Sequence, residues 1–339
     1  MDLIRKIFDE FYGIFKPFLF YVTRKDHEIA HDWFILFSKI LMATGLEKFV
    51  LDNKTNYKKI PFEISNGAGL DKNANISPMF FRYGGLDRIV YGTFTGEKWP
   101  GNSRPRTKRL IREKSLLNNI GWENDGSEII SNRLKLYKNY ETPITISIGF
   151  TPTPELSTEQ RLKDLEKTLN LFNDNEIHCI SRVEYNPSCP NLKISREENQ
   201  SFLVEAMPLI KSHLSPWQEL DVKVSSDLTD SGIEEFIKAT FDFVNGYVTT
   251  NATTQHDFGD GAGSGDCLYE LSLEVQKKIY KRLKGTNKNI TACGGINSFE
   301  RAMERIKFEP QEKKKIQILT PLFYEGFGLL RKLKTMKSF

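Results

Sequence analysis

The stretch Asn186-Pro-Ser-Cys189-Pro-Asn191 brings a thiol and two amides together in a short segment of the chain. A cysteine thiol ionises with a pKa of about 8.5, so a thiolate is reached much closer to neutral pH than a serine alkoxide. An asparagine side chain both donates and accepts hydrogen bonds, so it can pair with either kind of polar group on a ligand. This combination makes the stretch a candidate for chemistry, the alternative for Cys189 being an ordinary buried thiol.

Polar or glycine residues follow directly after an apolar run at several other places in the chain. These places are Gly67-Ala-Gly-Leu-Asp-Lys72, Gly92-Thr93, Lys223, Thr250-Asn251, Gly294-Gly295 and Thr320. They supply hydroxyls, amides and two lysines but no cluster of carboxylates, which disfavours glycoside hydrolysis. They also lack the Asp, Glu and His set that a divalent metal requires, so we expect no metal site.

Short apolar runs rich in β-branched and aromatic residues position these groups. The runs span residues 64–70, 88–94, 144–150, 178–186, 220–225, 246–251, 289–295 and 316–321. Helical patterns separate several of them, as at 159–172, 200–214 and 269–283. This alternation predicts an α/β fold, a (β/α)8 TIM barrel over residues 51–339 with its active site at the C-terminal ends of the strands. The segment 95–143 is longer than one crossover helix requires, so we expect it to contain an inserted loop over the barrel mouth.

Two glycine clusters lie near the last strands of the predicted barrel. Gly261-Ala-Gly-Ser-Gly265 precedes a predicted helix, and Gly294-Gly295 ends a predicted strand. Bare backbone N–H groups near helix N-termini attract phosphate, and the phosphate site of this fold is expected around strands seven and eight. Glycine also serves ordinary turns. The two clusters at the expected place predict a ligand that carries phosphate.

Residues 1–50 are expected to form a separate small α-helical domain. Apolar residues recur at helical spacing from Leu3 to Phe15, and Pro17 is expected to stop this first helix. A second helix is expected to begin near Asp26 and to end at Gly45. Both helices are amphipathic, with wide aromatic faces.

Such faces either pack on the barrel or lie on a bilayer surface. The sequence Phe18-Leu19-Phe20 at the junction of the helices favours the bilayer. No stretch approaches the roughly 18 apolar residues of a spanning helix. The four cysteines are scattered and are typical of reduced thiols in the cytosol. Together these features predict a peripheral protein on the cytoplasmic side of a membrane.

Other functional classes receive little support from the composition. The net charge is +4, and residues of opposite sign alternate along the chain without a dense basic block, so nucleic-acid binding is not expected. No two cysteines have C-x-x-C spacing, which argues against a zinc ribbon. The stretch His27-Glu-Ile-Ala-His31 matches the H-E-x-x-H pattern of zinc peptidases, but no third histidine follows at the required spacing.

Stretches along nearly the whole barrel match a known family in order. They are AGLDKN (68–73), GNSRPRTKRL (101–110), NNIGWENDG (118–126), NPSCPN (186–191), VKVSSDLT (222–229), TTNATT (249–254), GAGSG (261–265) and ACGGI (292–296). The chain thereby resembles the dihydroorotate dehydrogenases, which use FMN. Its N-terminal helices, with Glu28-Ile-Ala-His31, resemble the helical domain of the membrane-associated, quinone-using class 2 members. Cys189 instead resembles the base of soluble class 1 members, since class 2 usually carries serine.

The resemblance implies oxidation of dihydroorotate to orotate in pyrimidine biosynthesis, with FMN as cofactor, quinone as electron acceptor and Cys189 as catalytic base. The residues implied to bind substrate are Lys72, Asn118, Trp122, Asn186, Asn191, Asn251 and Ala252. Those implied to bind FMN are Ala68, Gly69, Lys72, Thr93, Asn118, Ser147, Asn186, Lys223, Thr250, Ser264, Gly265, Gly294, Gly295, Leu319 and Thr320. His31 and Arg109 match residues that contact the quinone.

Several positions depart from the family pattern. Ser147 stands where an asparagine is expected, and Leu319 replaces a tyrosine beside the phosphate site. Ala252 replaces a Ser or Thr that contacts the substrate, and Leu192 replaces a threonine linked to proton exit. Two alternatives therefore stay open: an FMN oxidoreductase acting on another cyclic amide, and a barrel that has lost catalysis.

Overall fold

The computed structural model describes residues 2–46, 60–153, 156–174, 177–192 and 196–335. The strands of its main sheet are β1 Phe62–Asn66, β2 Ile89–Phe94, β5 Ile144–Ile148, β6 Ile180–Tyr185, β7 Glu219–Val224, β8 Gly246–Thr249, β10 Asn289–Cys293 and β11 Lys314–Ile318. They pair in parallel in the order β1-β11-β10-β8-β7-β6-β5-β2. A parallel bridge between Ser65 and Arg88 joins the two ends of this order, which confirms the predicted (β/α)8 barrel.

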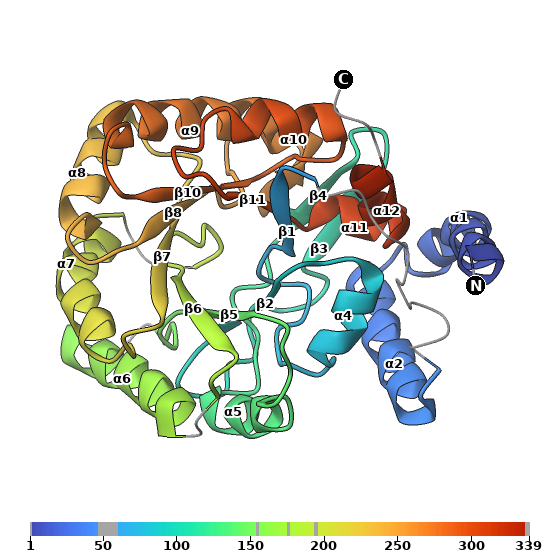
Figure 1. The fold of residues 1–339 in the computed structure, drawn as a ribbon, viewed down its shortest axis with the longest axis horizontal. Coiled ribbons are helices and arrows are strands. Elements are labelled where there is room, and N and C mark those ends of the chain that lie inside the picture. The colour runs from blue at the N-terminus through green and yellow to red at the C-terminus, as the bar shows by residue number, and fades with distance from the viewer. Residues whose placement is uncertain (1, 47–59, 154–155, 175–176, 193–195, 336–339) are drawn as a thin grey trace.

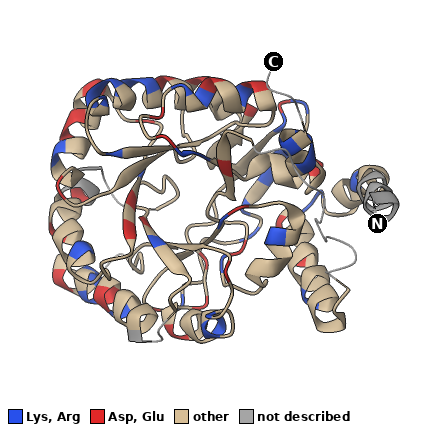
Figure 2. Ribbon diagram, viewed as in Figure 1, with Lys and Arg blue, Asp and Glu red and all other residues tan. Residues whose placement is uncertain are grey.

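Helices surround these strands. They are α4 Pro78–Gly84, α5 Ser127–Lys135, α6 Thr158–Asp174, α7 Arg196–Ser212, α8 Asp230–Thr240, α9 Tyr269–Leu283 and α10 Phe299–Ile306, followed by α11 Thr320–Glu325 and α12 Gly328–Thr335. Figure 1 shows α6 to α10 as an outer layer, and Figure 2 shows many charged residues along it. Strands covered in this way are buried along nearly their whole length, which explains the continuous apolar runs of the sequence.

A second, three-stranded antiparallel sheet covers the barrel mouth where a loop was expected. It consists of β3 Thr107–Leu110, β4 Ser115–Asn118 and β9 Ala262–Gly265. The hydroxyl of Tyr324 in α11 donates to the carbonyl oxygens of Leu110 and Ser115, which ties the hairpin to the barrel. The inserted segment is thus confirmed, but its strands were missed because they are short and β9 is remote in sequence.

The N-terminal helices are α1 Asp2–Val22 and α2 Glu28–Thr44, and Figure 1 shows them beside α4, α11 and α12, outside the ring. The second helix ends as predicted, with Gly45 at φ 68° as its C-cap. Asp26 lies just before it and accepts a hydrogen bond from the Glu28 backbone. No helix in the described part of the chain is both long and apolar enough to cross a membrane. The expected domain boundary at residues 50 and 51 lies outside the described residues.

The prediction that Pro17 stops the first helix is wrong, because α1 continues through it to Val22. Packing on both sides of the proline offsets the lost hydrogen bond. Before it, the Tyr12 hydroxyl donates to the Phe323 carbonyl at 2.8 Å. After it, the Phe20 ring packs edge-on against Tyr324, with 5.9 Å between centroids. The side chains of residues 1–11, which carry most of the predicted apolar face, lie outside the described part.

Candidate functional site

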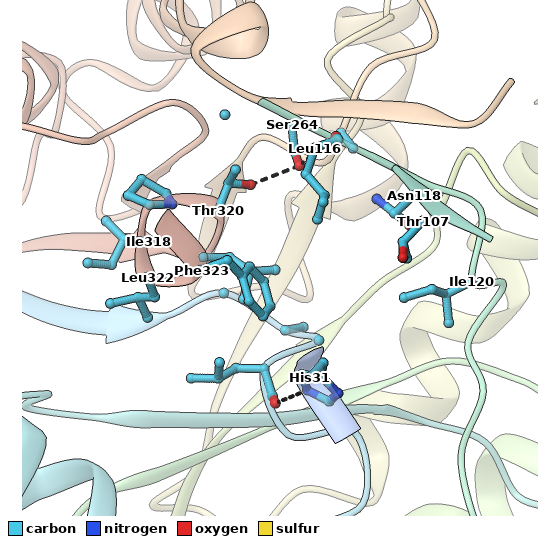
Figure 3. A pocket seen from close by; sticks show the side chains of 18 of the residues that line it. His31, Thr107, Leu116, Asn118, Ile120, Ser264, Ile318, Thr320, Leu322 and Phe323 are labelled. Atoms are coloured by element: carbon cyan, nitrogen blue, oxygen red, sulfur yellow. Dashed lines mark hydrogen bonds between the residues drawn. The ribbon is translucent and has the colours of Figure 1, made fainter. Parts of the chain in front are cut away.

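A cavity of about 550 Å³ lies at the C-terminal ends of the barrel strands and extends to the N-terminal helices. Loops that follow the strands form its polar part. Residues of α1, α2 and α11 form an apolar part. Figure 3 shows where the two meet, with Phe323 of α11 between the hydrogen-bonded pair Ser264 and Thr320 on one side and His31 on the other.

Nearly all the residues predicted from the sequence line this one cavity. They are Cys189, Lys72, Asn118, Trp122, Asn186, Asn191, Asn251, Ala252, Ala68, Gly69, Thr93, Lys223, Thr250, Ser264, Gly265, Gly294, Gly295, Leu319, Thr320, His31 and Arg109. Ser147 does not line it, because it is fully buried behind Thr93 with 3.1 Å between the two hydroxyl oxygens. Ser147 therefore supports Thr93 from the barrel interior.

The asparagines of the polar part hold one another in place. Asn186 Nδ2 donates to Thr93 Oγ1 at 3.0 Å, and Asn251 Nδ2 donates to Asn186 Oδ1 at 3.0 Å. Across the cavity, Asn191 Nδ2 donates to Asn118 Oδ1 at 2.7 Å. These bonds limit rotation of the amides, so the polar wall is preorganised for a ring with its own donors and acceptors.

Cys189 follows Asn186 and precedes Asn191 in the same loop, lines the cavity and is partly accessible. The surrounding protein excludes water, and this desolvation raises the pKa of the Cys189 thiol to about 11. The backbone N–H of Asn191 and the charge of Lys223 act in the opposite direction but do not cancel it. Near neutral pH the group is therefore a thiol, and it accepts a proton only after it has ionised.

Lys223 is a buried cation beneath the polar part. Its Nζ donates to Glu184 Oε1 at 3.3 Å, and Gln317 Nε2 donates to Glu184 Oε2 at 2.7 Å. Burial lowers the pKa of Lys223, but the charge of Glu184 outweighs it and raises the pKa overall. Lys223 thus keeps its charge inside the barrel. Sequence reasoning missed Glu184 because its partners are 39 and 133 residues away.

Lys72 connects the barrel to α2 through carboxylates. Its Nζ donates to Glu28 Oε1 at 2.9 Å and to Glu123 Oε2 at 2.5 Å. Glu28 also accepts two hydrogen bonds from Arg106, at 2.8 and 3.0 Å. Burial raises the pKa of Glu28, but hydrogen bonds and charge from Arg106 and Lys72 outweigh this and hold it at about 2. Both carboxylates belong to motifs found in the sequence, but sequence reasoning assigned neither one as a partner of Lys72.

A glycine cradle lies at the ends of β9 and β10. Gly265, Gly294 and Gly295 have φ values of 94°, 111° and 67°, in the region that disfavours side chains. A Cβ on Gly294 would lie 2.6 Å from the Ser272 hydroxyl, and one on Gly295 would lie 2.6 Å from the Tyr269 Cβ. Only glycine therefore allows the backbone to line the cavity at this point.

Arg305, a fully buried residue that sequence reasoning missed, sets the direction of this backbone. Its guanidinium donates to the carbonyl oxygens of Cys293, Gly294 and Thr249 at 2.7 to 3.0 Å. In a trans peptide the N–H points opposite to the C=O. The N–H groups of Gly294 and Gly295 therefore point away from Arg305. Such an array of N–H groups fits the phosphate of a bound cofactor.

Trp122 forms one wall of the polar part. It has a left-handed backbone, with φ 63°, and it follows Gly121 at φ 72°. Its ring lies against Gly149, where an added Cβ would come within 2.5 Å of it, and edge-on to Phe150. Its Nε1 is buried and has no hydrogen-bond partner among the described residues.

The apolar part of the cavity is walled by aromatic residues that the sequence did not identify as site residues. They are Phe15, Phe20, Phe34, Phe37, Phe80, Phe323 and Phe327. His31 and Arg109 add polar groups to this wall. His31 Nε2 lies 2.7 Å from the Leu70 carbonyl oxygen, and burial lowers the pKa of His31. The Arg109 guanidinium stacks on the Phe20 ring at 4.1 Å from its centroid.

The stretch from His27 to His31 does not bring its side chains to a common point. His27 Nδ1 accepts a hydrogen bond from the Arg109 backbone N–H at 2.8 Å, while His31 faces Leu70 and Glu28 binds Lys72. Within the described ranges, no group of three or more His, Cys, Asp or Glu residues is placed to hold a metal ion. The zinc-peptidase pattern is therefore accounted for by helix packing.

Known proteins share this architecture. The family model for dihydroorotate dehydrogenase matches residues 51–335. A dihydroorotate dehydrogenase (quinone) of Natronomonas pharaonis is 30% identical, over 94% of this chain and 92% of its own. One of Helicobacter acinonychis is 28% identical, over 95% and 92%.

Solved structures show the same fold. A dihydroorotate dehydrogenase of Eimeria tenella in complex with ferulenol superimposes with a TM-score of 0.75 at 20% identity, over 93% of this chain and 92% of that chain. The family model covers the whole described barrel, and the sequence motifs of the family meet in one cavity. The chain belongs to the dihydroorotate dehydrogenase family.

Proposed function

We propose that this protein oxidises dihydroorotate to orotate in pyrimidine biosynthesis, with bound FMN as cofactor and a quinone as electron acceptor. The observation that carries the proposal is a single cavity in which amides, Cys189 and two lysines adjoin an aromatic part beside His31 and Arg109. An enzyme that passes electrons from a polar substrate to an apolar one needs a polar and an apolar binding surface near one cofactor. The related proteins named dihydroorotate dehydrogenase (quinone) support both substrates.

The reaction removes a hydride from one ring carbon of dihydroorotate and a proton from its neighbour. FMN, when bound, supplies the hydride acceptor. Cys189, as thiolate, takes the proton, and the electrons of that C–H bond form the ring double bond. Asn118, Asn186, Asn191 and Asn251 hold the ring through its amide groups.

The substrate also carries a carboxylate, and Lys72 is the cation of the polar part placed to meet it. Trp122 lines the cavity beside these amides and covers the ring. Ala252 lies beside Asn251 and contributes only its methyl group. This distribution supports an orientation in which the charged end of the substrate points toward α2.

The polar part of the cavity fits FMN. Ser264, Gly265, Gly294, Gly295 and Thr320 supply backbone and hydroxyl donors for the phosphate, and Lys223 supplies positive charge where the reduced ring gains electrons. The remaining residues that we assign to the cofactor are Ala68, Gly69, Lys72, Thr93, Asn118, Asn186, Thr250 and Leu319, with Ser147 supporting Thr93.

We further propose that residues 1–50 form a domain that rests on the cytoplasmic side of a membrane and admits the quinone past His31 and Arg109. The described part of this domain exposes a set of large apolar side chains. They are Ile14, Phe18, Tyr21, Val22, Trp33, Leu36, Phe37 and Ile40. Figure 2 shows few charged residues on α2. Apolar surface of this extent on paired helices supports peripheral binding to lipid.

The test is anaerobic reduction of the purified, flavin-containing protein. Dihydroorotate should bleach the flavin absorbance, and a short-chain quinone should restore it. Dihydrouracil, which has the ring without the carboxylate, serves as the control for another cyclic amide. A yellow protein that only dihydrouracil bleaches would contradict the substrate, and a colourless protein would indicate a barrel without catalysis.

A further inference from the structure

Lys72 already binds two carboxylates before any substrate arrives. Its Nζ lies 2.9 Å from Glu28 Oε1 and 2.5 Å from Glu123 Oε2. The substrate's carboxylate would be a third anion at the same ammonium group. Because like charges at such short range repel, one of the three carboxylates must leave Lys72 when the substrate binds.

The two protein carboxylates differ sharply in how they are held. The Glu28 side chain is 1% exposed and also contacts Arg106 and Arg104, at 2.8 and 3.3 Å. Removing it from its partners would leave buried charges without compensation. The Glu123 side chain is 32% exposed, so water can solvate it once it leaves Lys72. Glu123 is therefore the carboxylate that can move.

Glu123 can leave Lys72 by moving only its side chain. Its neighbour Asn124 is fixed by paired backbone hydrogen bonds with Trp99, at 2.9 and 3.0 Å. Arg106 Nη2 lies 2.6 Å from the same Glu123 oxygen, so it provides a second partner after the exchange. The displaced carboxylate thus keeps one cation while Lys72 becomes available.

We propose that Glu123 is a displaceable counter-ion of Lys72, whose place the substrate's carboxylate takes, while Glu28 remains as the permanent partner. This makes Glu123 a specificity-determining residue: a ligand with a carboxylate exchanges with it, and a neutral cyclic amide leaves it in place. The inference rests on the proposed role of Lys72 in binding the substrate's carboxylate.

The test compares the binding of orotate and uracil to the flavin-containing protein and to its Glu123→Gln variant, by perturbation of the flavin spectrum. Without the competing charge, orotate should bind about 1.5- to 5-fold more tightly, the range expected for a partly exposed ion pair. Uracil has the same ring without the carboxylate, and its affinity should not change. In turnover, KM for dihydroorotate should fall with little change in kcat.

Asp125→Asn is the matched control, because Asp125 lies in the same segment, is 30% exposed and pairs with Arg133 instead of Lys72. It should bind both ligands as the parent does. Weaker or unchanged orotate binding in Glu123→Gln, or an equal shift for uracil, overturns the proposal. Failure of the proposed function looks different, since dihydroorotate then does not bleach the parent flavin. If dihydroorotate bleaches the parent flavin but Glu123→Gln binds orotate no more tightly than the parent does, the exchange falls and the function stands. If Glu123→Gln binds orotate more tightly but dihydroorotate does not bleach the parent flavin, the exchange stands and the function falls.

Discussion

At the scale of single residues, Cys189→Ala removes the proposed proton acceptor and leaves the surrounding amides in place. Flavin reduction by dihydroorotate should slow by about 10²- to 10⁴-fold, the usual contribution of a positioned base. Stopped-flow absorbance measures this step, and the flavin content should stay normal. Cys293→Ala is the control, because this second thiol also lines the cavity. Near-normal reduction in Cys189→Ala would exclude Cys189 as the base.

The pKa of Cys189 predicts how the rate of flavin reduction depends on pH. Desolvation raises that pKa to about 11, so at neutral pH only a small fraction is thiolate. The base works in its deprotonated form, and its fraction grows with pH up to the pKa. The rate of flavin reduction should therefore rise about tenfold per pH unit between pH 7 and 9. A flat profile under conditions where chemistry limits the rate contradicts this assignment.

Ala252 is the residue where the cavity lacks a hydroxyl that the family pattern expects. The neighbouring Thr253 cannot replace it, because its Oγ1 donates to Asp227 at 2.5 Å and accepts from the Gln255 backbone at 2.9 Å. A substrate group left unpaired costs about 1–3 kcal/mol. Ala252→Thr should thus tighten dihydroorotate binding by roughly 5- to 150-fold. Flavin titration of both proteins measures it, and weaker binding in the variant points to another substrate.

At the scale of elements, Glu28 is the charge that docks α2 on the barrel. Its pKa is about 2 in the folded protein against an ordinary value of 4.5. Since the folded value is the lower one, the carboxylate stabilises the fold above about pH 4.5, and this contribution of about 3 kcal/mol is lost as the pH falls toward 2. Glu28→Gln should lower the free energy of unfolding at pH 7 by about 3–5 kcal/mol.

Urea unfolding at pH 7 and at pH 3 measures this effect. The parent should lose stability between the two conditions by more than Glu28→Gln does. Glu159→Gln on α6 is the control, because Glu159 is exposed and pairs with Lys163, which is exposed as well. Equal stability of the two variants at pH 7 would show that the Glu28 cluster does not stabilise the docked helix.

The barrel strands could be predicted from the sequence, whereas the short strands at the barrel mouth could not. Buried parallel strands such as Ile144–Ile148 give continuous apolar runs, so the barrel and its strand ends were predictable. The strands β3, β4 and β9 have four residues each, too few to give a clear pattern, and β9 pairs with β4 across a long sequence separation. Glu184 and Arg305 were missed for a related reason: their partners come from distant strands and loops, and only the fold brings them together.

At the scale of the whole molecule, the apolar face of α1 and α2 is the surface to test. Phe18, Leu36 and Ile40 are exposed and do not line the cavity, so replacing all three with serine alters the face without altering the site. Each side chain is worth up to about 1.5–3 kcal/mol when buried in lipid. The triple variant should lose roughly 100-fold or more in partition onto anionic lipid vesicles.

The variant should keep normal bleaching of its flavin by dihydroorotate, because the polar part of the cavity is untouched. Vesicle co-sedimentation measures the partition. Val204→Ser on α7 is the control, since Val204 is equally exposed but lies away from the N-terminal helices. Unchanged partition of the triple variant would contradict the membrane assignment.

The aromatic part of the cavity has side chains of α1 and α2 among its walls, the same helices whose outer face we place on lipid. A quinone on this route is dissolved in the bilayer and not in water, so the quantity that governs its rate is its mole fraction in the lipid. Adding quinone-free vesicles should therefore slow turnover by surface dilution, even though the total amount of quinone is constant. Added vesicles should not dilute dihydroorotate, because its effective concentration depends only on the volume of buffer. The turnover rate would then depend on the concentration of dihydroorotate in the buffer and on the mole fraction of quinone in the lipid.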